Sequence, residues 1–262
     1  MAETASSSAP AAESRPRRLQ FRRVLDIILR PRATLGGVSA LDRSLAFTPM
    51  LLLLSLLLLR VIVIAPIKAA QAEGGALSGP AFQYYTPEQQ AQIQQALEAT
   101  RGPTFQYVLP IGWALLTGVT LWTLTAGLLY LISTMQGGRG SMTRALNLVA
   151  WASVPTLIHL IVQVVSIQST GKLIANPGLS GFAAPPPEGS LVARAVLSRI
   201  DLYLFWHALL LLIGLKPFTG LSARKTWITV IASLTIVMGV RILPDVLVAQ
   251  LAGLTIIQPF LF

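Results

Sequence analysis

The chain has 262 residues, of which 53% are hydrophobic and only 11% are charged. A soluble domain carries about 25% charged residues, so this composition excludes an ordinary water-soluble fold. The formal net charge is +10, but eight of the twenty Lys and Arg residues precede the first apolar run, which argues against the charge being a nucleic-acid-binding patch.

The amino-terminal region divides into a tail and a helix. Residues 1–18 are small, polar and proline-bearing, which predicts a disordered cytoplasmic tail. Residues 19–44 predict a basic amphipathic helix, ended by Pro31, and a segment leading into the membrane. The apolar face comprises Phe21, Val24, Leu25, Ile28 and Leu29. The arginines expected to contact anionic inner-leaflet lipids are Arg22, Arg23, Arg30 and Arg32. Periodicity alone leaves both lipid and the cytoplasmic ends of the bundle open as partners of the apolar face.

Five apolar stretches are long enough to cross a bilayer, which takes about 20 helical residues. They cover residues 45–66, 105–132, 146–167, 200–216 and 226–250. The first follows 44 polar and basic residues and is longer than a signal-peptide core, so we expect a span. Residues 251–262 form an apolar tail that is too short to cross again. The sequence therefore predicts an all-α integral membrane bundle of five transmembrane helices.

The loop charges predict the orientation of this bundle. The amino-terminal segment and the loops after the second and fourth spans carry twelve Lys and Arg residues, whereas the two loops on the other side carry five. Because positive loops stay in the cytoplasm, we expect a cytoplasmic amino terminus and an outer carboxyl terminus. The excess of Arg over Lys is typical of a GC-rich bacterial genome, which favours the cytoplasmic (inner) membrane of a bacterium as the location.

The two outer loops differ in their expected order. Thr86 can cap a helix, Pro87 suits its first position, and Gly102-Pro103 ends it. The second outer loop contains Asn176-Pro177-Gly178 and three consecutive prolines at residues 185–187, which predict a loose connector.

Motifs for catalysis and for cofactor binding are missing from this sequence. The chain has no cysteine, which excludes thiolate metal sites and cysteine nucleophiles. GGRGS at residues 137–141 lacks the Lys-Ser/Thr pair of a phosphate-binding loop and predicts a flexible turn. Neither Gly-x-Ser-x-Gly nor His-Glu-x-x-His occurs. We therefore expect a non-enzymatic protein without a metal or other cofactor.

Polar residues inside the spans form one candidate cluster in the outer half of the membrane. Its members are Arg60, His159, Gln163, Asp201, His207, Arg241 and Asp245. A charge that faces lipid costs about 2.5 to 3.5 kcal/mol on insertion scales, so these groups should face inward and pair. Arg60 and Arg241 with two aspartates would make a neutral set of four, and Asp201 would mark the outer mouth of the fourth span.

Three interpretations of this cluster remain open. It can be structural, fixing the register of the helices through hydrogen bonds and ion pairs. It can be a pocket for a polar ligand, an ion or the headgroup of an outer-leaflet lipid. His159 and His207 lie at similar depth on adjacent antiparallel spans, so they can also be the axial ligands of a haem.

Three stretches of the chain carry a family resemblance. They are ILRPRATL at residues 28–35, AWASVPTLI at residues 150–158 and RIDLYLFWHALLLLIGL at residues 199–215. They resemble a Pro-x-x-Thr motif, an aromatic-rich stretch leading to a proline in the third span, and an Asp-Leu-aromatic start of the fourth span. In this order they are similar to the bacterial branch of the YIP (Ypt-interacting protein) family. The resemblance covers about residues 19–250 and implies a five-helix membrane domain with a cytoplasmic amino terminus.

The resemblance also limits the expected function. Eukaryotic relatives bind Rab-type GTPases and shape or sort vesicle membranes through their cytoplasmic amino-terminal regions. DLYLF at residues 201–205 departs from their Asp-Leu-Tyr-Gly-Pro motif, so GTPase binding does not carry over to this chain. We expect a scaffold, adaptor or membrane-organising protein that contacts the bilayer, anionic inner-leaflet lipids, and a protein partner or another copy of itself. The alternative is a small transporter or lipid-handling protein with a polar ligand pocket in the outer half of the bilayer.

Overall fold

Five helices in the computed structural model are long and apolar enough to cross a membrane, which confirms the predicted all-α class and span count. They cover Phe47–Ala72, Thr104–Met135, Met142–Thr170, Leu202–Thr219 and Ala223–Leu247. The structure describes residues 20–40, 44–78, 84–184 and 190–252. The predicted tail at residues 1–18, the proline run at residues 185–187 and most of the carboxyl-terminal segment 251–262 lie outside these ranges.

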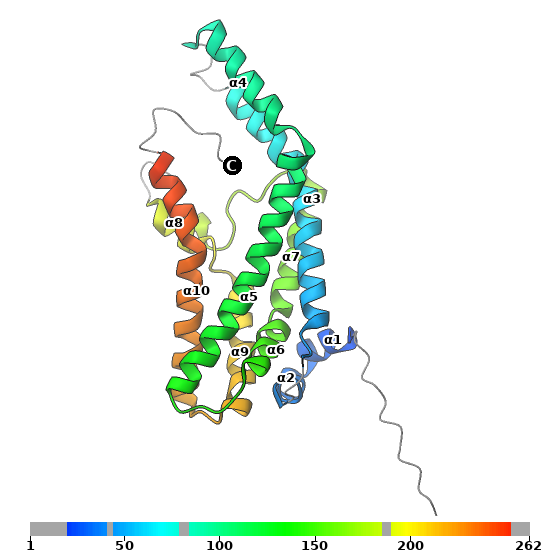
Figure 1. The fold of residues 1–262 in the computed structure, drawn as a ribbon, viewed down its shortest axis with the longest axis vertical. Coiled ribbons are helices and arrows are strands. Elements are labelled where there is room, and N and C mark those ends of the chain that lie inside the picture. The colour runs from blue at the N-terminus through cyan, green and yellow to red at the C-terminus, as the bar shows by residue number, and fades with distance from the viewer. Residues whose placement is uncertain (1–19, 41–43, 79–83, 185–189, 253–262) are drawn as a thin grey trace, which may run out of the picture.

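All regular secondary structure in the described residues is helical (Figure 1). The α-helices are α1 (Arg22–Leu29), α2 (Pro31–Ala40), α3 (Phe47–Ser78), α4 (Pro87–Thr100), α5 (Leu109–Met135), α6 (Met142–Ala152), α7 (Val154–Thr170), α8 (Leu191–Leu197), α9 (Leu202–Thr219) and α10 (Ala223–Ala252). A π-helical turn, η2 (Thr104–Val108), precedes α5, and a 3-10 turn, η3 (Ser180–Phe182), precedes α8. Helices α1 and α2 lie at one end of the bundle, and α4 lies at the other (Figure 1).

The amino-terminal helix is followed directly by a second helix that the sequence analysis did not predict. Pro31 ends α1 as predicted, since the residue before a proline is disfavoured in the helical region, and Arg30 has φ −139°. Both the backbone N–H and the hydroxyl of Thr34 then donate to the Arg30 carbonyl, at 3.1 and 3.0 Å. The Pro-x-x-Thr motif therefore forms the joint between α1 and α2. Helix α2 was missed because its Gly-Gly pair and weak apolar periodicity give little helical signal.

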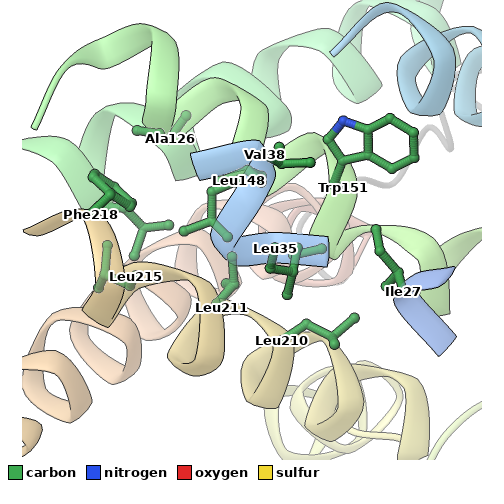
Figure 2. Packing of buried hydrophobic residues seen from close by; sticks show 14 of the residues in the cluster. Ile27, Leu35, Val38, Ala126, Leu148, Trp151, Leu210, Leu211, Leu215 and Phe218 are labelled. Carbon is green, nitrogen blue, oxygen red and sulfur yellow. The ribbon is translucent and has the colours of Figure 1, made fainter. Parts of the chain in front are cut away.

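Helix α2 packs against α6 and α9 and contributes to the main core. Leu35 and Val38 are buried there, and Leu35 lies close to Leu210 and Leu211 of α9 (Figure 2). Gly214 of α9 permits this approach, because a Cβ at that position would overlap Leu148 of α6. The segment that was expected only to lead into the membrane is thus a packed part of the bundle.

Two hydrogen bonds join the start of α3 to α6. The backbone N–H of Leu45 donates to Oδ1 of the buried Asn147 at 2.8 Å, and Nε1 of the buried Trp151 donates to the Leu45 carbonyl at 3.0 Å. The bonds satisfy polar groups of Leu45, Asn147 and Trp151 that would otherwise be costly to bury.

The third span is divided into α6 and α7. Ser153 separates them, and its hydroxyl donates to the Ala150 carbonyl at 2.6 Å. The cause is Pro155, which has no N–H and therefore cannot continue the hydrogen-bond ladder of α6. The sequence predicts one apolar stretch that contains a proline, whereas the structure shows a break near the middle of this span.

In the connection between the third and fourth spans, the residues that the structure describes are not the loose connector that the sequence predicted. The backbone N–H of Leu179 donates to the carbonyls of Leu197 and Ile200, at 2.9 and 3.0 Å. The Arg194 side chain donates from Nη2 to Oδ1 of Asn176 at 2.8 Å. Gly178, with φ +58°, allows the chain to lie against these carbonyls. Its turn residues fold the segment back onto the end of α8. In the connection between the first and second spans, the predicted helix is confirmed as α4, with a capping box between Thr86 and Gln89.

Candidate functional site

The basic helix α1 presents three different sides. Ile27 is completely buried in the core, and Val24 packs beside it, so one side faces the bundle. Most of the predicted apolar face is exposed instead, with Phe21 at 52%, Leu25 at 61% and Leu29 at 76%. Periodicity leaves bundle and lipid as alternative partners, whereas the described residues show a bundle-facing side and a separate apolar side without a protein partner.

The arginines expected to contact lipid are divided by this geometry. At about 100° per residue, Arg22 lies at the border of the exposed apolar side, beside Leu29. Arg23 and Arg30 lie on the opposite side, where with Asp26 they line an open cleft between α1 and α2 that has a volume of about 370 Å³. Arg32 is exposed on α2.

The structure brings four members of the predicted polar cluster together in one chain of hydrogen bonds. Nε of Arg60 on α3 donates to Oε1 of Gln163 on α7 at 2.8 Å. The Gln163 amide nitrogen lies 2.7 Å from Nε2 of His159, one turn away on the same helix. Nδ1 of His159 lies 3.1 Å from Oδ2 of Asp201. Residues of α3 and α7 are thereby linked to the first residue of the fourth span.

The donors along this chain can be assigned from its chemistry. Because Oε1 of Gln163 accepts from Arg60, its amide nitrogen donates, and Nε2 of His159 must accept. Nδ1 then carries the ring proton and donates to the Asp201 carboxylate. His159 is therefore neutral, and both ring nitrogens are occupied. A haem iron would find no free nitrogen on His159 in this arrangement, which weakens the haem interpretation.

The fourth span begins directly after Asp201, and Tyr203 on its first turn contacts His159. Oδ1 of Asp201 accepts the backbone N–H of Leu204 at 2.7 Å, so Asp201 is the N-cap of α9. The ring of Tyr203 stacks on His159, with ring centroids 4.7 Å apart. The sequence analysis missed Tyr203, although its position two residues after Asp201 places it on the first turn of the span.

Helix α9 begins beside the first half of α7, so that α7 extends beyond the start of α9. His159, which contacts Asp201, lies eleven residues or about 16 Å before the end of α7. Asp201 directly precedes the fourth candidate span, Leu202–Thr219, and its location at the outer face stays a prediction. The order of residues along one helix gives no information on how far its neighbours extend.

His207 has a separate role from His159. Its Nδ1 lies 2.7 Å from the carbonyl oxygen of Ala152, and since a carbonyl only accepts, Nδ1 is the donor. Ala152 is the last residue of α6, directly before the break caused by Pro155. His207 thus attaches α9 to the break in the third span.

The remaining charges pair differently from the expected neutral set. Oδ2 of Asp245 on α10 bonds Nη2 of Arg199 at 2.6 Å. Arg199 was assigned to a loop by the sequence analysis and was not included in the cluster. Arg241, one turn from Asp245, makes no hydrogen bond or ion pair with any residue that the structure describes.

The three stretches that carry the family resemblance meet in this part of the molecule. The Pro-x-x-Thr joint places Leu35 of α2 against α6 and α9, and the Ala152 carbonyl, next to the break at Ser153, accepts the bond from His207. Helix α9 contacts α2, α6 and α7. Segments that are more than 100 residues apart in the chain therefore form one contiguous unit.

Comparison with known proteins gives one positive result. The model of the Yip1 domain matches residues 25–243. No curated protein and no solved structure matches the chain.

Proposed function

This chain belongs to the Yip1 domain family, and from that premise we propose that it is a non-enzymatic scaffold or adaptor that organises the membrane around it. In this proposal α1 lies in the interface of the cytoplasmic leaflet and binds anionic lipid. The bundle holds a protein partner or another copy of the chain. The observation that supports the proposal is the exposed apolar side of α1 next to a side that is fixed in the core.

The geometry of α1 suits an interfacial helix. Ile27 fixes the helix to the bundle, so its rotation about its own axis is set. With this side held, Phe21, Leu25 and Leu29 face away from the protein core and can enter the acyl-chain boundary. Arg22, at the border of that side, can reach the headgroup phosphates, a contact worth about 1 kcal/mol per basic residue at an anionic surface.

We propose that α1, α2 and the loop between α5 and α6 face the cytoplasm and that the membrane is the inner membrane of a bacterium. The distribution of loop charges supports this orientation. The cleft lined by Arg23 and Arg30 then opens toward the cytosol rather than toward the acyl chains.

The experiment uses the complete chain, whose lack of cysteine allows single-site labelling. An environment-sensitive fluorophore is attached to Leu25→Cys, and the protein is reconstituted into vesicles that contain lipids brominated in the acyl chains. We expect several-fold stronger quenching at residue 25 than at Arg30→Cys, which lies about 140° around the same helix. Adding Arg22→Glu should lower the quenching at residue 25 in phosphatidylglycerol vesicles and leave it unchanged in phosphatidylcholine vesicles.

Two outcomes would contradict the proposal. Equal quenching at residues 25 and 30 would mean that α1 has no fixed lipid side. Quenching at residue 25 that is the same in both lipids, with and without Arg22→Glu, would exclude recognition of anionic lipid.

A further inference from the structure

With Arg199 added and His207 set apart, the polar cluster consists of one part linked by a chain of hydrogen bonds and one part in which Arg241 has no partner among the described residues. In the first, Arg60, Gln163 and His159 bond one another in series and end on Asp201. This part fits the structural interpretation, because each link joins two helices or two turns of one helix. The second part contains Arg199, Asp245 and Arg241, and its hydrogen bonds are incomplete.

Arg241 and Arg199 compete for one carboxylate. Asp245 lies four residues after Arg241 on α10, the spacing at which side chains of a helix meet. The Asp245 carboxylate nevertheless bonds Arg199, at 2.6 Å. Arg241 therefore lies in the electrostatic field of Arg199, Asp201 and Asp245 without a hydrogen bond to any described residue. Nε of Arg199 is also enclosed, and no described residue accepts a hydrogen bond from it.

Counting charges gives an excess of one positive charge. The two parts together hold three arginines and two aspartates, and His159 is neutral by its hydrogen bonds. A guanidinium keeps its proton under all ordinary conditions, so the excess cannot be removed by deprotonation. An uncompensated charge at membrane depth is unfavourable by several kcal/mol, which makes the binding of one more anion favourable.

The position of Arg241 selects the kind of anion. It lies six residues, or about 9 Å, before Leu247, where the fifth candidate span ends. The flexible stem of an arginine lets its guanidinium reach toward the headgroups from this depth. Helix α10 contacts α8 and α9 there, so Arg199 approaches the same region from the segment between them.

We propose that Arg241 and Arg199 bind the phosphate group of a membrane lipid with net negative charge, in the leaflet opposite to α1. The planar guanidinium of Arg241 supplies two parallel donors to the phosphate oxygens, and the positive charge of Arg199 nearby adds to the attraction. The lipid neutralises the excess charge of the cluster. This site is independent of α1, so the interfacial function of α1 can fail without affecting it.

The complete chain, reconstituted in equal parts of phosphatidylglycerol and phosphatidylcholine and then extracted in mild neutral detergent, provides the test. The lipid that stays bound is counted by mass spectrometry. We expect the wild type to retain phosphatidylglycerol in preference to phosphatidylcholine, and Arg241→Gln to lose this retention by about tenfold or more, the effect of one charge-assisted hydrogen bond. Arg224→Gln is the matched control, because Arg224 is exposed at the other end of α10.

A second variant changes the result in the opposite direction. Asp245→Asn releases Arg199 and raises the excess charge from one to two, so it should retain more phosphatidylglycerol than the wild type. This expectation also tests the site if Arg241→Gln does not fold.

Three results would overturn the proposal. They are equal retention of phosphatidylglycerol by Arg241→Gln, Arg224→Gln and the wild type; equal or lower retention by Asp245→Asn; and equal retention of the two lipids by the wild type. Inorganic phosphate provides the remaining arm. If it raises the unfolding temperature of the wild type as much as phosphatidylglycerol does, the assignment to a lipid is wrong.

Discussion

Replacing Gly214 by alanine tests the packing of α2 between α6 and α9. The new Cβ would overlap the side chain of Leu148 on α6 and would lie 3.5 Å from Cβ of Leu35 on α2. Leu148 and Leu35 are both completely buried, so neither can move without displacing further core residues.

The expected loss of stability follows from this lack of space. Adding a methyl group to a filled core costs about 1 to 3 kcal/mol, because side chains leave their preferred rotamers or the helices separate. Against this, alanine is favoured over glycine inside a helix by about 0.5 to 1 kcal/mol. The overlap with Leu148 should dominate, giving a net loss of about 1 to 2 kcal/mol in the free energy of unfolding.

The assay is reversible unfolding of the complete chain in mixed micelles by increasing the fraction of denaturing detergent. Gly239→Ala is the matched control, since a Cβ there meets nothing within 4 Å. Gly239→Ala should equal or exceed the wild type in stability by up to about 1 kcal/mol. If Gly214→Ala is as stable as Gly239→Ala, then the close approach of α9 to α6 and α2 is wrong.

Two further predictions concern the polar cluster and the orientation. In a double-mutant cycle, Asp201→Asn and His159→Phe should show a coupling energy of about 1 kcal/mol in the free energy of unfolding. The reason is that asparagine still caps α9 but lacks the charge that accepts the hydrogen bond from His159. Additive effects of the two substitutions would contradict the assigned bond. The orientation is tested with two single-cysteine variants, Arg139→Cys between α5 and α6 and Thr100→Cys at the end of α4. An impermeant maleimide should label Thr100→Cys from outside intact cells and Arg139→Cys only after permeabilisation. Labelling of both variants from one side would exclude the five-span orientation.

The parts of the fold that could be predicted depend on local sequence. Each span is an apolar run of sufficient length, and the helix around Pro87 is recognised from its cap at Thr86. The same local signals explain the end of α1 at Pro31. Helix α2 was missed because its stability comes from burial of Leu35 between α6 and α9, which no window of the sequence contains.

The polar cluster shows the same limit. Residue type and depth along each span identified Arg60, His159 and Asp201 as members that should face inward. Their partners could not be predicted, because each polar group bonds a neighbour in space and the sequence does not show which residues are neighbours. Asp245 forms its ion pair with Arg199 and not with Arg241, although Arg241 is only one turn away on the same helix.

The amino-acid sequence by itself determined a basic, helical, five-span membrane chain, since hydrophobic length and the position of charges act residue by residue. Only the tertiary structure decided that α9 begins beside His159, that α1 has one side fixed in the core and another exposed, and that Arg241 has no ion-pair partner among the described residues. These features depend on contacts between segments far apart in the chain, such as that of Arg60 with Gln163, which are 103 residues apart. Such contacts are set by packing, which the local pattern of the chain does not contain.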